Sequence, residues 1–593
     1  MNTRLKLIIF FITFIMIILL VRVYSLSIKS NEYYEHLSVQ NYVKRIYTKP
    51  IRGIIKDRNG VPLAINNLGF SIEVKPHLDS TRGIKRLEKV CELIATQFPD
   101  KFTKEELLTK YKRKNSPYRH DNVQLIEFIP YEEFFPKYVV LNGNTDLKID
   151  TATKRFYPYK SMGAHVLGYT GRAGTKDIKK DITVKYTNIL GKSGLEKFYN
   201  DKLQGSLGFR DVKVNALNEE IEIQKEVLPS TNNDIETTID IRLQEYVHKL
   251  FGKKAGAVVV MNSNNGEILA AGSFPEFDNN IFVNGVSHQE WQNIINDFNH
   301  PFTNKLVNGH YPPGSVIKMG VAHSFMENGL GRNFEVYCNG EMPLGKRKFR
   351  CWKEDGHGKV GFTKAIRESC DDFFYKGSLK VGINSIHDTL DKYGIGHPTG
   401  VDQPNEFKGT NPNKAWKKKR YKMPWYVGET VVSSIGQGFI LVTPMQVARY
   451  TAGLTNAELP TPHFIKSEEL NNKKQKIEIG KRELKLLQKG MYQVSYHANG
   501  TASKYIRSKV KIAAKTGTAQ VVSIPQSEKK RMKEHELEYF HRSQAWLTTY
   551  APFKNPQYVI TILVEHGGHG GSAAGPMVGK IYDKLLELGH IKE

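Results

Sequence analysis

Residues 311–318 read YPPGSVIK and place a serine, Ser315, three positions before a lysine, Lys318. Residues three apart lie on the same face of a helix, so the Lys318 amine can reach the Ser315 hydroxyl. A serine hydroxyl is a poor nucleophile at its free pKa, and a desolvated lysine with a lowered pKa can act as its base. The pattern alone is weak, because Ser508 and Ser527 also precede a lysine by three positions, in Lys-rich stretches typical of a solvated surface.

Two further motifs follow Ser315 along the chain. In SCD at residues 369–371, a hydroxyl and a carboxyl group two positions apart could both line a cleft, although the same tripeptide also suits a helix N-cap. KTGT at residues 515–518 follows a strand-like run, and strand alternation directs Lys515 and Gly517 to one face. Glycine lets a substrate backbone approach closely, and a lysine can anchor a substrate carboxylate.

Three weak motifs in this order make a strong signal, because Ser-x-x-Lys, Ser-x-Asp and Lys-Thr-Gly together are typical of penicilloyl-serine transferases. The chain resembles a class B penicillin-binding protein of the elongation-specific penicillin-binding protein 2 type. The resemblance runs almost from end to end and includes RGIIKDRNG (52–60), GAHVLGYTG (163–171), GKSGLE (191–196), the residues 352–357, TGVD (399–402), IGQG (435–438), TPMQ (443–446) and KTGTAQ (515–520). Asp371 stands where most of the superfamily has asparagine, and aspartate is common in elongation-type members.

The resemblance implies a serine-type D-Ala-D-Ala transpeptidase/carboxypeptidase that cross-links peptidoglycan during elongation and rod-shape maintenance. Ser315 would attack the penultimate D-alanine of a stem peptide, with Lys318 as general base. Ser369, beside Asp371, would pass a proton to the leaving amine. The resulting acyl-enzyme would be transferred to an amine of a neighbouring stem, and β-lactams would acylate Ser315 as substrate mimics.

The resemblance also assigns the substrate-binding residues Lys515, Thr516, Gly517 and Thr518. The Lys515 amine and the hydroxyls of Thr516 and Thr518 would hold the terminal carboxylate of the stem peptide. The backbone N–H groups of Ser315 and Thr518 would form the oxyanion hole.

Three of the four cysteines lie close together in the chain with one histidine: Cys338, Cys351, His357 and Cys370. Three thiolates and an imidazole suit a closed, tetrahedral structural zinc site. The resemblance places a metal site in this region, with carboxylates at some ligand positions. One disulfide with an odd thiol, or three inert thiols, are the alternatives. Bound zinc would hold the 369–371 loop without touching substrate.

The N-terminal residues 7–26 read LIIFFITFIMIILLVRVYSL and approach the length that crosses a bilayer. Arg4 and Lys6 precede this run, which favours a cytoplasmic tail over residues 1–6. A cleaved signal peptide is the alternative, but it usually has a shorter apolar centre and a small-x-small cleavage site. We therefore expect a single-pass anchor in the cytoplasmic (inner) membrane, with the bulk of the chain outside the cytoplasm.

The remaining chain divides at the polar, turn-rich residues 229–234. We expect a mixed pedestal (dimerisation-type) domain over 27–230 and a transpeptidase domain over 235–593. Strand-like runs at 255–261 and 267–273, joined by an Asn-Gly turn, and at 511–514, 545–551 and 558–565 enclose a helical middle. This order predicts an α+β fold with helices packed on an antiparallel sheet, and the charged residues 525–541 suit an exposed loop or short helix.

The composition excludes several classes of protein. With 40% hydrophobic and 11% aromatic residues the chain is not disordered, and four cysteines in 593 residues do not build a disulfide scaffold. A formal net charge of +26 points to anionic surroundings, unless it is only a Lys-rich surface bias. An extracytoplasmic location makes acidic lipid and an anionic wall better partners than nucleic acid.

Four other functions compete with this interpretation. A bifunctional glycan polymerase would need another catalytic domain upstream, and the large N-terminal region argues against a β-lactamase. A division-specific transpeptidase is the nearest alternative, and a non-catalytic β-lactam-binding sensor or wall-assembly scaffold comes from a different class. The resemblance implies, as partners of the pedestal, a membrane-embedded RodA-like (SEDS-type) glycan polymerase and an MreC-like rod-complex scaffold protein.

Overall fold

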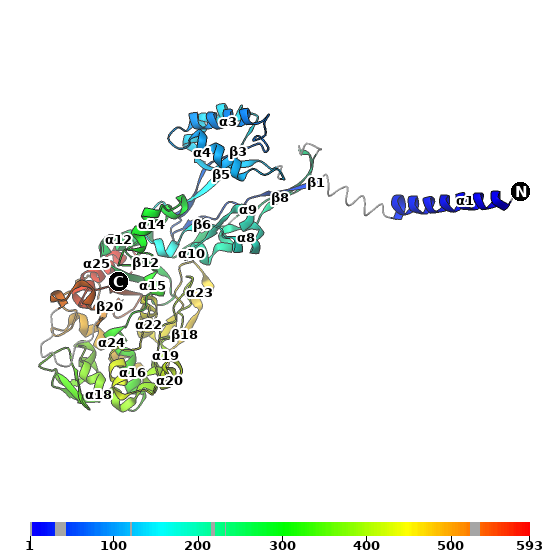
Figure 1. The fold of residues 1–593 in the computed structure, drawn as a ribbon. Coiled ribbons are helices and arrows are strands. Elements are labelled where there is room, and N and C mark those ends of the chain that lie inside the picture. The colour runs from blue at the N-terminus through cyan, green and yellow to red at the C-terminus, as the bar shows by residue number, and fades with distance from the viewer. Residues whose placement is uncertain are drawn as a thin grey trace. The chain divides into compact units, whose positions relative to one another are not determined.

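The computed structural model describes residues 3–29, 43–118, 121–214, 220–231, 233–521 and 534–592. The chain forms two compact units, coloured along the sequence in Figure 1. The small unit comprises Met1–Gly53, Arg172–Ile189 and Gln204–Asn233, and the large unit comprises Ile54–Gly171, Leu190–Leu203 and Asp234–Glu593. The boundary expected between residues 230 and 235 stays a prediction.

The small unit begins with the apolar helix α1 (Thr3–Tyr24), all of whose residues are exposed. Among the described residues, one helical stretch, Thr3–Ser27, is long and apolar enough to cross a membrane, with a mean hydropathy of 2.8. At about 1.5 Å per residue such a helix matches a hydrocarbon core of about 30 Å. The stretch includes all of the anchor predicted over 7–26, and α1 is the candidate single-pass membrane anchor.

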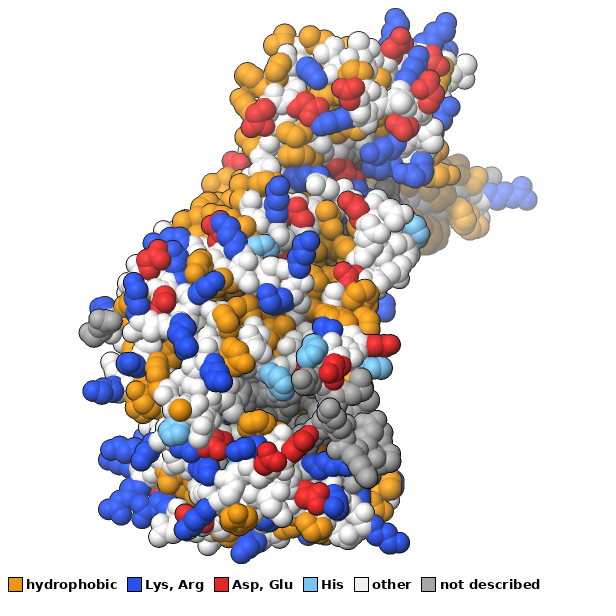
Figure 2. Space-filling view, turned by 90° about the vertical axis from the view of Figure 1, so that its left-hand side faces the viewer, with side chains coloured by type: hydrophobic (Ala, Val, Ile, Leu, Met, Phe, Trp, Pro, Cys, Tyr) orange, Lys and Arg blue, Asp and Glu red, His pale blue; other side chains and the backbone are white. Residues whose placement is uncertain are grey.

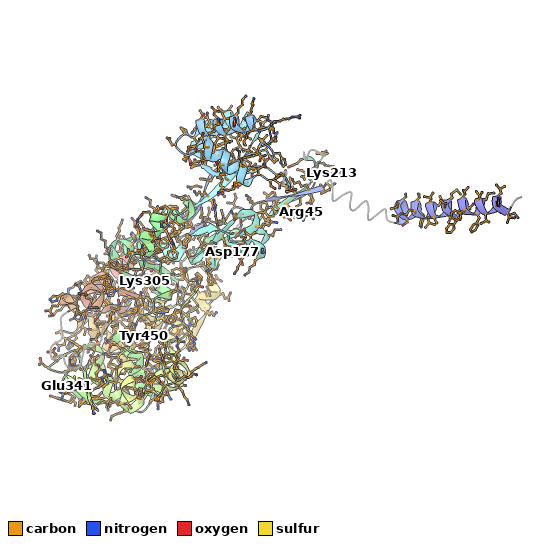
Figure 3. The ribbon with its side chains drawn as sticks, in the orientation of Figure 1. Arg45, Asp177, Lys213, Lys305, Glu341 and Tyr450 are labelled. Carbon is orange, nitrogen blue, oxygen red and sulfur yellow. The ribbon has the colours of Figure 1, made fainter. Side chains whose placement is uncertain are left out.

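A three-stranded antiparallel sheet follows in the small unit, in the order β1 (Val43–Thr48), β8 (Gly208–Val214) and β9 (Glu220–Val227). Arg45, labelled in Figure 3, faces Asp211 across β1 and β8. Its guanidinium donates to both carboxylate oxygens of Asp211, at 2.7 and 2.8 Å. The Arg45 hydrogen bonds lower the pKa of Asp211. Such a cross-strand pair favours this register.

The first part of the large unit contains its own small core. Strands β4 (Val123–Pro130), β3 (Pro62–Val74) and β5 (Leu147–Phe156) pair antiparallel in that order. Helices α3 (Ile84–Gln97) and α4 (Lys104–Lys114) contribute apolar residues to the same core. Cys91 of α3 is fully buried, and burial raises its pKa to about 11.

The central sheet of the large unit confirms the predicted α+β class. Its antiparallel order is β12 (Ile268–Phe274), β11 (Gly256–Asn262), β21 (Tyr558–Val564), β20 (Gln544–Ala551) and β19 (Ala513–Ala519). Strands from both ends of the domain thus meet in one sheet. The predicted turn between β11 and β12 is present, with Gly266 at φ +86°.

Both faces of this sheet are covered by helices, as alternate residues of β11 show. Val258 and Val260 pack in the core that includes α12 (Ile241–Phe251) and α25 (Gly570–Glu587). Val259 and Met261 pack in the core that includes α16 (Lys318–Glu327) and α22 (Pro444–Asn456). A strand that is buried on both faces has a continuous apolar sequence, as β11 does.

The charged segment expected over residues 525–541 lies partly outside the described residues, which resume at Glu534. Two short 3₁₀ turns, Glu534–Glu536 and Tyr539–His541, follow there. They are not part of the sheet, as expected. On the face that Figure 2 shows, Lys and Arg side chains are spread across the surface.

Candidate active site and metal cluster

The turn that carries Ser315 is held from two sides. It is a short 3₁₀ helix, Gly314–Ile317, that leads directly into α16. Gly314 N–H donates to Gly436 O at 2.8 Å, and both glycines have positive φ, +56° and +75°. The Trp546 indole N–H donates to Pro312 O at 3.1 Å. Ser315 is half-buried at this turn.

Lys318, the first residue of α16, is completely buried and makes three hydrogen bonds to the 369–371 loop. Its Nζ donates to Asp371 Oδ1 at 2.7 Å, to Ser369 O at 3.0 Å and to Ser369 Oγ at 3.3 Å. The structure therefore brings together the first two sequence motifs through the lysine of one and both polar residues of the other.

The 369–371 loop joins α17 (Phe362–Arg367) to α18 (Asp371–Val381). Ser369 has φ +55°, a conformation uncommon for a residue with a side chain and often found at functional sites. The helix N-cap is Cys370, without a side-chain capping bond, so the N-cap explanation for Ser369 does not hold. Asp371 Oδ2 accepts a hydrogen bond from Trp352 N–H at 2.9 Å, which fixes the carboxylate facing Lys318.

Lys515 of β19 contacts the same serine. Its Nζ donates to Ser369 Oγ at 3.0 Å and to Thr516 O at 2.8 Å. The side chain is completely buried, and burial together with the nearby Lys318 holds the pKa of Lys515 well below its usual range. Ser369 Oγ is thus a shared acceptor for two lysines, a geometry suited to proton transfer.

Strand β19 packs tightly against the nucleophile turn. A Cβ at Gly517 would lie 3.0 Å from Val316 Cγ1 and from Trp546 Cβ, and one at Gly314 would lie 3.0 Å from Thr518 O. Among the described residues, β19 is an end strand of the sheet and pairs only with β20, on one side. An unpaired edge beside a nucleophile can accept an extended peptide by backbone hydrogen bonds.

Two residues of the site were not anticipated from the sequence. Trp352 orients Asp371 by its backbone N–H, and Thr501 shares a hydrogen bond of 2.7 Å between its Oγ1 and Thr516 Oγ1. A backbone donor carries no sequence signal, and a lone threonine is too common to single out.

The cysteine and histidine residues singled out in the sequence form one buried cluster. One ligand atom from each of Cys338, Cys351, His357 and Cys370 lies within 4.8 Å of all the others. His357 Nδ1 lies 3.6 Å from Cys338 Sγ and 3.5 Å from Cys351 Sγ. With Zn–S of about 2.3 Å and Zn–N of about 2.0–2.1 Å, a tetrahedral site separates sulfur and nitrogen by about 3.6 Å.

The thiols of this cluster are chemically suited to a cation. All four cysteines of the chain are free, so the disulfide alternative is not the arrangement seen. Hydrogen bonds with Cys370, and then with His357, lower the pKa of Cys338 and of Cys351. The donor set fits a structural zinc ion, and Cys370 links the cluster to Ser369 and Asp371.

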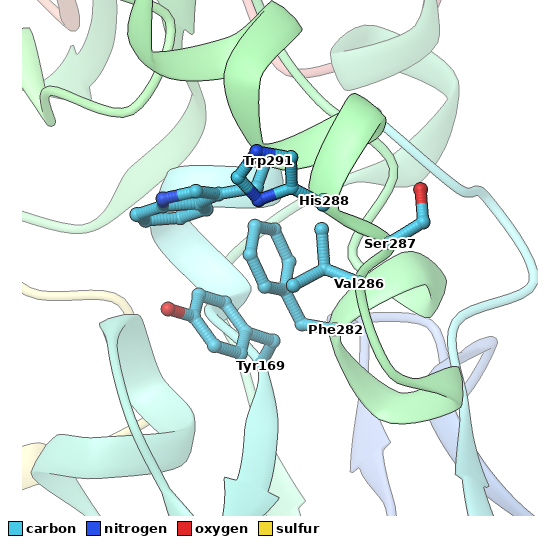
Figure 4. Close-up of a pocket in the computed structure, with 6 residues that line it drawn as sticks. All are labelled: Tyr169, Phe282, Val286, Ser287, His288 and Trp291. Atoms are coloured by element: carbon cyan, nitrogen blue, oxygen red, sulfur yellow. The ribbon is translucent and has the colours of Figure 1, made fainter.

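A separate aromatic pocket of about 510 Å³ does not include the residues above. It is lined by Tyr169, Phe282, Val286, Ser287, His288 and Trp291 (Figure 4). The Tyr169 and Phe282 rings stack with centroids 4.2 Å apart.

Comparisons with known proteins agree with this geometry. The family model for the penicillin-binding protein transpeptidase domain matches residues 256–583, and that for the penicillin-binding protein dimerisation domain matches residues 47–237. The peptidoglycan D,D-transpeptidase MrdA of Escherichia coli K12 is 33% identical, covering 96% of this chain and 91% of that protein.

Two solved structures have the same fold over nearly the whole chain. Penicillin-binding protein 2 of Helicobacter pylori, in complex with MreC, is 42% identical, with a TM-score of 0.85 over 93% of this chain and 99% of that chain. A component of a peptidoglycan synthase complex that coordinates polymerization and crosslinking is 25% identical, with a TM-score of 0.70 over 100% of this chain and 99% of that one. This chain therefore belongs to the class B penicillin-binding proteins, of the penicillin-binding protein 2 type.

Proposed function

We propose that this protein is a peptidoglycan D,D-transpeptidase that cross-links stem peptides through an acyl-enzyme on Ser315 during cell-wall elongation. The observation that carries the proposal is the convergence of two buried lysines, Lys318 and Lys515, on Ser369 Oγ, at 3.3 and 3.0 Å. Such a cluster serves to move protons, and it adjoins the Ser315 turn.

In acylation, Ser315 Oγ attacks the carbonyl carbon of the penultimate D-alanine, and its proton passes to Lys318, the general base. Asp371 Oδ1, 2.7 Å from Nζ, balances the ammonium that forms. The backbone N–H groups of Ser315 and Thr518 stabilise the oxyanion. When the C–N bond breaks, Ser369 relays the proton from Lys318 to the leaving D-alanine amine.

In transfer, the amine of a neighbouring stem attacks the ester on Ser315. The same hydroxyl, Ser369 Oγ, accepts the proton of that amine and passes its own proton to Lys318. Lys318 then returns a proton to Ser315 as the ester bond breaks. Earlier, during acylation, the carboxylate of the terminal D-alanine is held by Lys515, Thr516 and Thr518 until that D-alanine leaves. Gly517 keeps the strand open to the substrate backbone.

Labelling with a fluorescent penicillin tests the nucleophile. We expect the wild type to be labelled and Ser315→Ala to lose labelling completely. Ser508→Ala is the matched control, because Ser508 also precedes a lysine by three positions, but its hydroxyl donates to Asp583 at 2.8 Å. Equal labelling of the wild type and Ser315→Ala would refute the assignment. Cross-link formation in a reconstituted wall-synthesis assay separates an enzyme from a non-catalytic scaffold.

We propose that Cys338, Cys351, His357 and Cys370 hold a structural zinc ion. The free, buried thiols and the nitrogen–sulfur distances support this. Zinc would supply no chemistry to the substrate, and it would fix the loop on which Ser369 lies.

Metal analysis of the purified protein tests the zinc site. We expect one zinc per chain in the wild type, a loss in Cys351→Ser, and no change in Cys91→Ser, whose cysteine lies in the separate core of α3. Less than one zinc in the wild type, or a Cys–Cys bond found by mass spectrometry, would contradict the proposal.

For location and partners, we propose that α1 anchors the protein in the cytoplasmic membrane with its N-terminus inside and the bulk outside. Arg4 and Lys6 support this orientation. The relatives in complexes with MreC and in a synthase complex support recruitment of a rod-complex scaffold and a RodA-like polymerase. A phosphatase fused after Glu593 should be active only if the C-terminus lies outside the cytoplasm, and inactivity would reverse the orientation.

A further inference from the structure

Residues 414–427 form a strongly basic surface segment that the proposed chemistry does not use. They read KAWKKKRYKMPWYV, with six Lys and Arg and no Asp or Glu. Helix α20 (Lys414–Tyr421) occupies the first part and ends at Lys422, with φ +58°. We call residues 414–427, together with Phe439, the basic platform.

Aromatic side chains hold the platform together. The Trp416, Tyr421 and Phe439 rings pack mutually with centroids 5.3–5.6 Å apart. Buried Lys417 pairs with Glu429 and lies with its Nζ 4.4 Å from the centre of the Tyr426 ring. Tyr421 and Tyr426 are still 47% and 52% exposed, so part of each ring is open for stacking.

The other five basic residues of the platform are exposed, and within the described part of the chain none has an acidic partner: Lys414, Lys418, Lys419, Arg420 and Lys422. Like charges four apart on a helix, as at Lys414 and Lys418, are destabilising. Basic groups in the last turn complement the helix dipole, which offsets part of this repulsion. An anionic ligand would offset the rest.

The loop that carries Phe439 also contacts the nucleophile turn. Phe439 follows three residues after Gly436, whose carbonyl accepts the Gly314 N–H at 2.8 Å. Gly314 immediately precedes Ser315. This loop therefore links the platform, through Phe439, to the turn that carries Ser315.

We propose that the basic platform binds the glycan strand that carries the stem peptides, as an accessory site of the transpeptidase. This rests on the proposed function. Peptide carboxylates would pair with Lys418, Lys419 and Arg420, and sugar faces would stack on Tyr421 and Tyr426. Exposed rings beside the charges favour a glycopeptide polymer over an anionic lipid surface. A continuous glycan strand offers both carboxylates for the charges and sugar faces for the rings, whereas a lipid surface offers only headgroup charge.

Co-sedimentation of the full-length protein with purified sacculi tests the site. A triple variant, Lys418→Ala, Lys419→Ala and Arg420→Ala, should bind about tenfold more weakly, since three exposed ion pairs are lost. The matched control is Lys112→Ala, Arg113→Ala and Lys114→Ala, which removes the same charge from the last turn of α4. The control should bind like the wild type.

Chemical treatment of the polymer identifies the charge that is recognised. Sacculi whose carboxylates have been converted to amides should bind the wild type as weakly as the triple variant binds untreated sacculi. Raising the salt concentration should weaken wild-type binding to untreated sacculi, since exposed charge pairs are screened.

Three outcomes would overturn the proposal. The triple variant and its control could bind sacculi equally, or the wild type could bind intact and amidated sacculi equally. In a parallel co-sedimentation with anionic lipid vesicles, the triple variant could lose binding to the vesicles alone. Penicillin labelling of Ser315 should be unchanged in the triple variant, so failure here is distinguishable from failure of the proposed chemistry. Should the triple variant misfold and lose labelling, the wild type on intact and amidated sacculi decides the question.

Discussion

At the scale of single residues, the unusual feature is two buried lysines that share one hydroxyl. Ser369 Oγ accepts from Lys318 and from Lys515, while the carboxylate of Asp371 accepts from Lys318 and from the Trp352 N–H. Burial, and then the charge of Lys318, lower the pKa of Lys515. The folded protein therefore keeps an electrostatically costly group where it can exchange protons, a trade of stability for activity.

We expect Lys515→Met to stabilise the fold by about 1–4 kcal/mol near pH 7, because an apolar side chain of similar volume replaces an amine that is costly to bury. A lysine whose folded pKa is lowered gives a stability that rises with pH up to its ordinary pKa of about 10.4. The gain from methionine should therefore shrink between neutral pH and about pH 10. Urea unfolding across this range measures it, and penicillin labelling should be lost.

Lys305→Met is the matched control for a buried lysine that has a full partner. Lys305 Nζ lies 2.5 Å from Glu565 Oε2, and Tyr311 donates to the other oxygen of the same carboxylate. Removing this amine leaves Glu565 without its cation and should cost about 3–5 kcal/mol. A stability gain in Lys305→Met, or a pH-independent effect of Lys515→Met, would contradict the reasoning.

Sequence patterns predict contacts within one short segment of this site more readily than contacts between distant segments. Ser315 and Lys318 are three positions apart, so helix geometry alone predicts their proximity. The wholly buried state of Lys515 depends on how β19 packs, which its four-residue motif does not encode. For this reason the motif suggested a carboxylate anchor, while the structure adds hydrogen bonds to Ser369 and Thr516 O.

At the scale of secondary-structure elements, the nucleophile turn depends on the close approach of another loop. A Cβ on Gly436 would lie 2.1 Å from Gly314 O, and Gly436 also has φ +75°. We expect Gly436→Ala to push the loop away and to lower the rate of penicillin acylation at least about tenfold, about 1.4 kcal/mol in the barrier. Stopped-flow or time-resolved labelling measures this rate.

Gly382→Ala separates the clash from backbone strain. Gly382 has φ +84°, but nothing lies within 4 Å of the position of its Cβ. This control should lose about 1 kcal/mol of stability and keep its acylation rate. If both variants acylate at the wild-type rate, the contact between the two glycines does not position Ser315.

The elements also show where sequence patterns suffice. Apolar runs and an Asn-Gly turn predicted the β11–β12 hairpin and the sheet built from both ends of the domain. The four short strands around the cysteines were not anticipated: β13 (Glu335–Cys338), β14 (Glu341–Leu344), β15 (Arg347–Arg350) and β16 (Gly358–Gly361). Four residues are too few to establish a period, so their pairing depends on the surrounding fold.

At the scale of the whole molecule, the apolar N-terminal helix is independent of the hydrophobic cores. Every residue of α1 is exposed, and the described core clusters of the large unit begin at Ile55. Exposed apolar surface of this extent is typical of a segment that meets another partner, here a bilayer. Folding of the large unit should therefore not require α1.

We expect a chain lacking residues 1–29 to be soluble and to react with fluorescent penicillin at the rate of the full-length protein. The deletion removes α1 and the turn that follows it, Ser25–Lys29, and leaves all core residues in place. Fractionation should move the protein from the membrane to the soluble fraction, while the labelled site stays Ser315 by peptide mapping. A truncated chain that stays in the membrane fraction would show a second attachment, and one that is soluble but unreactive would show that the anchor supports the active site.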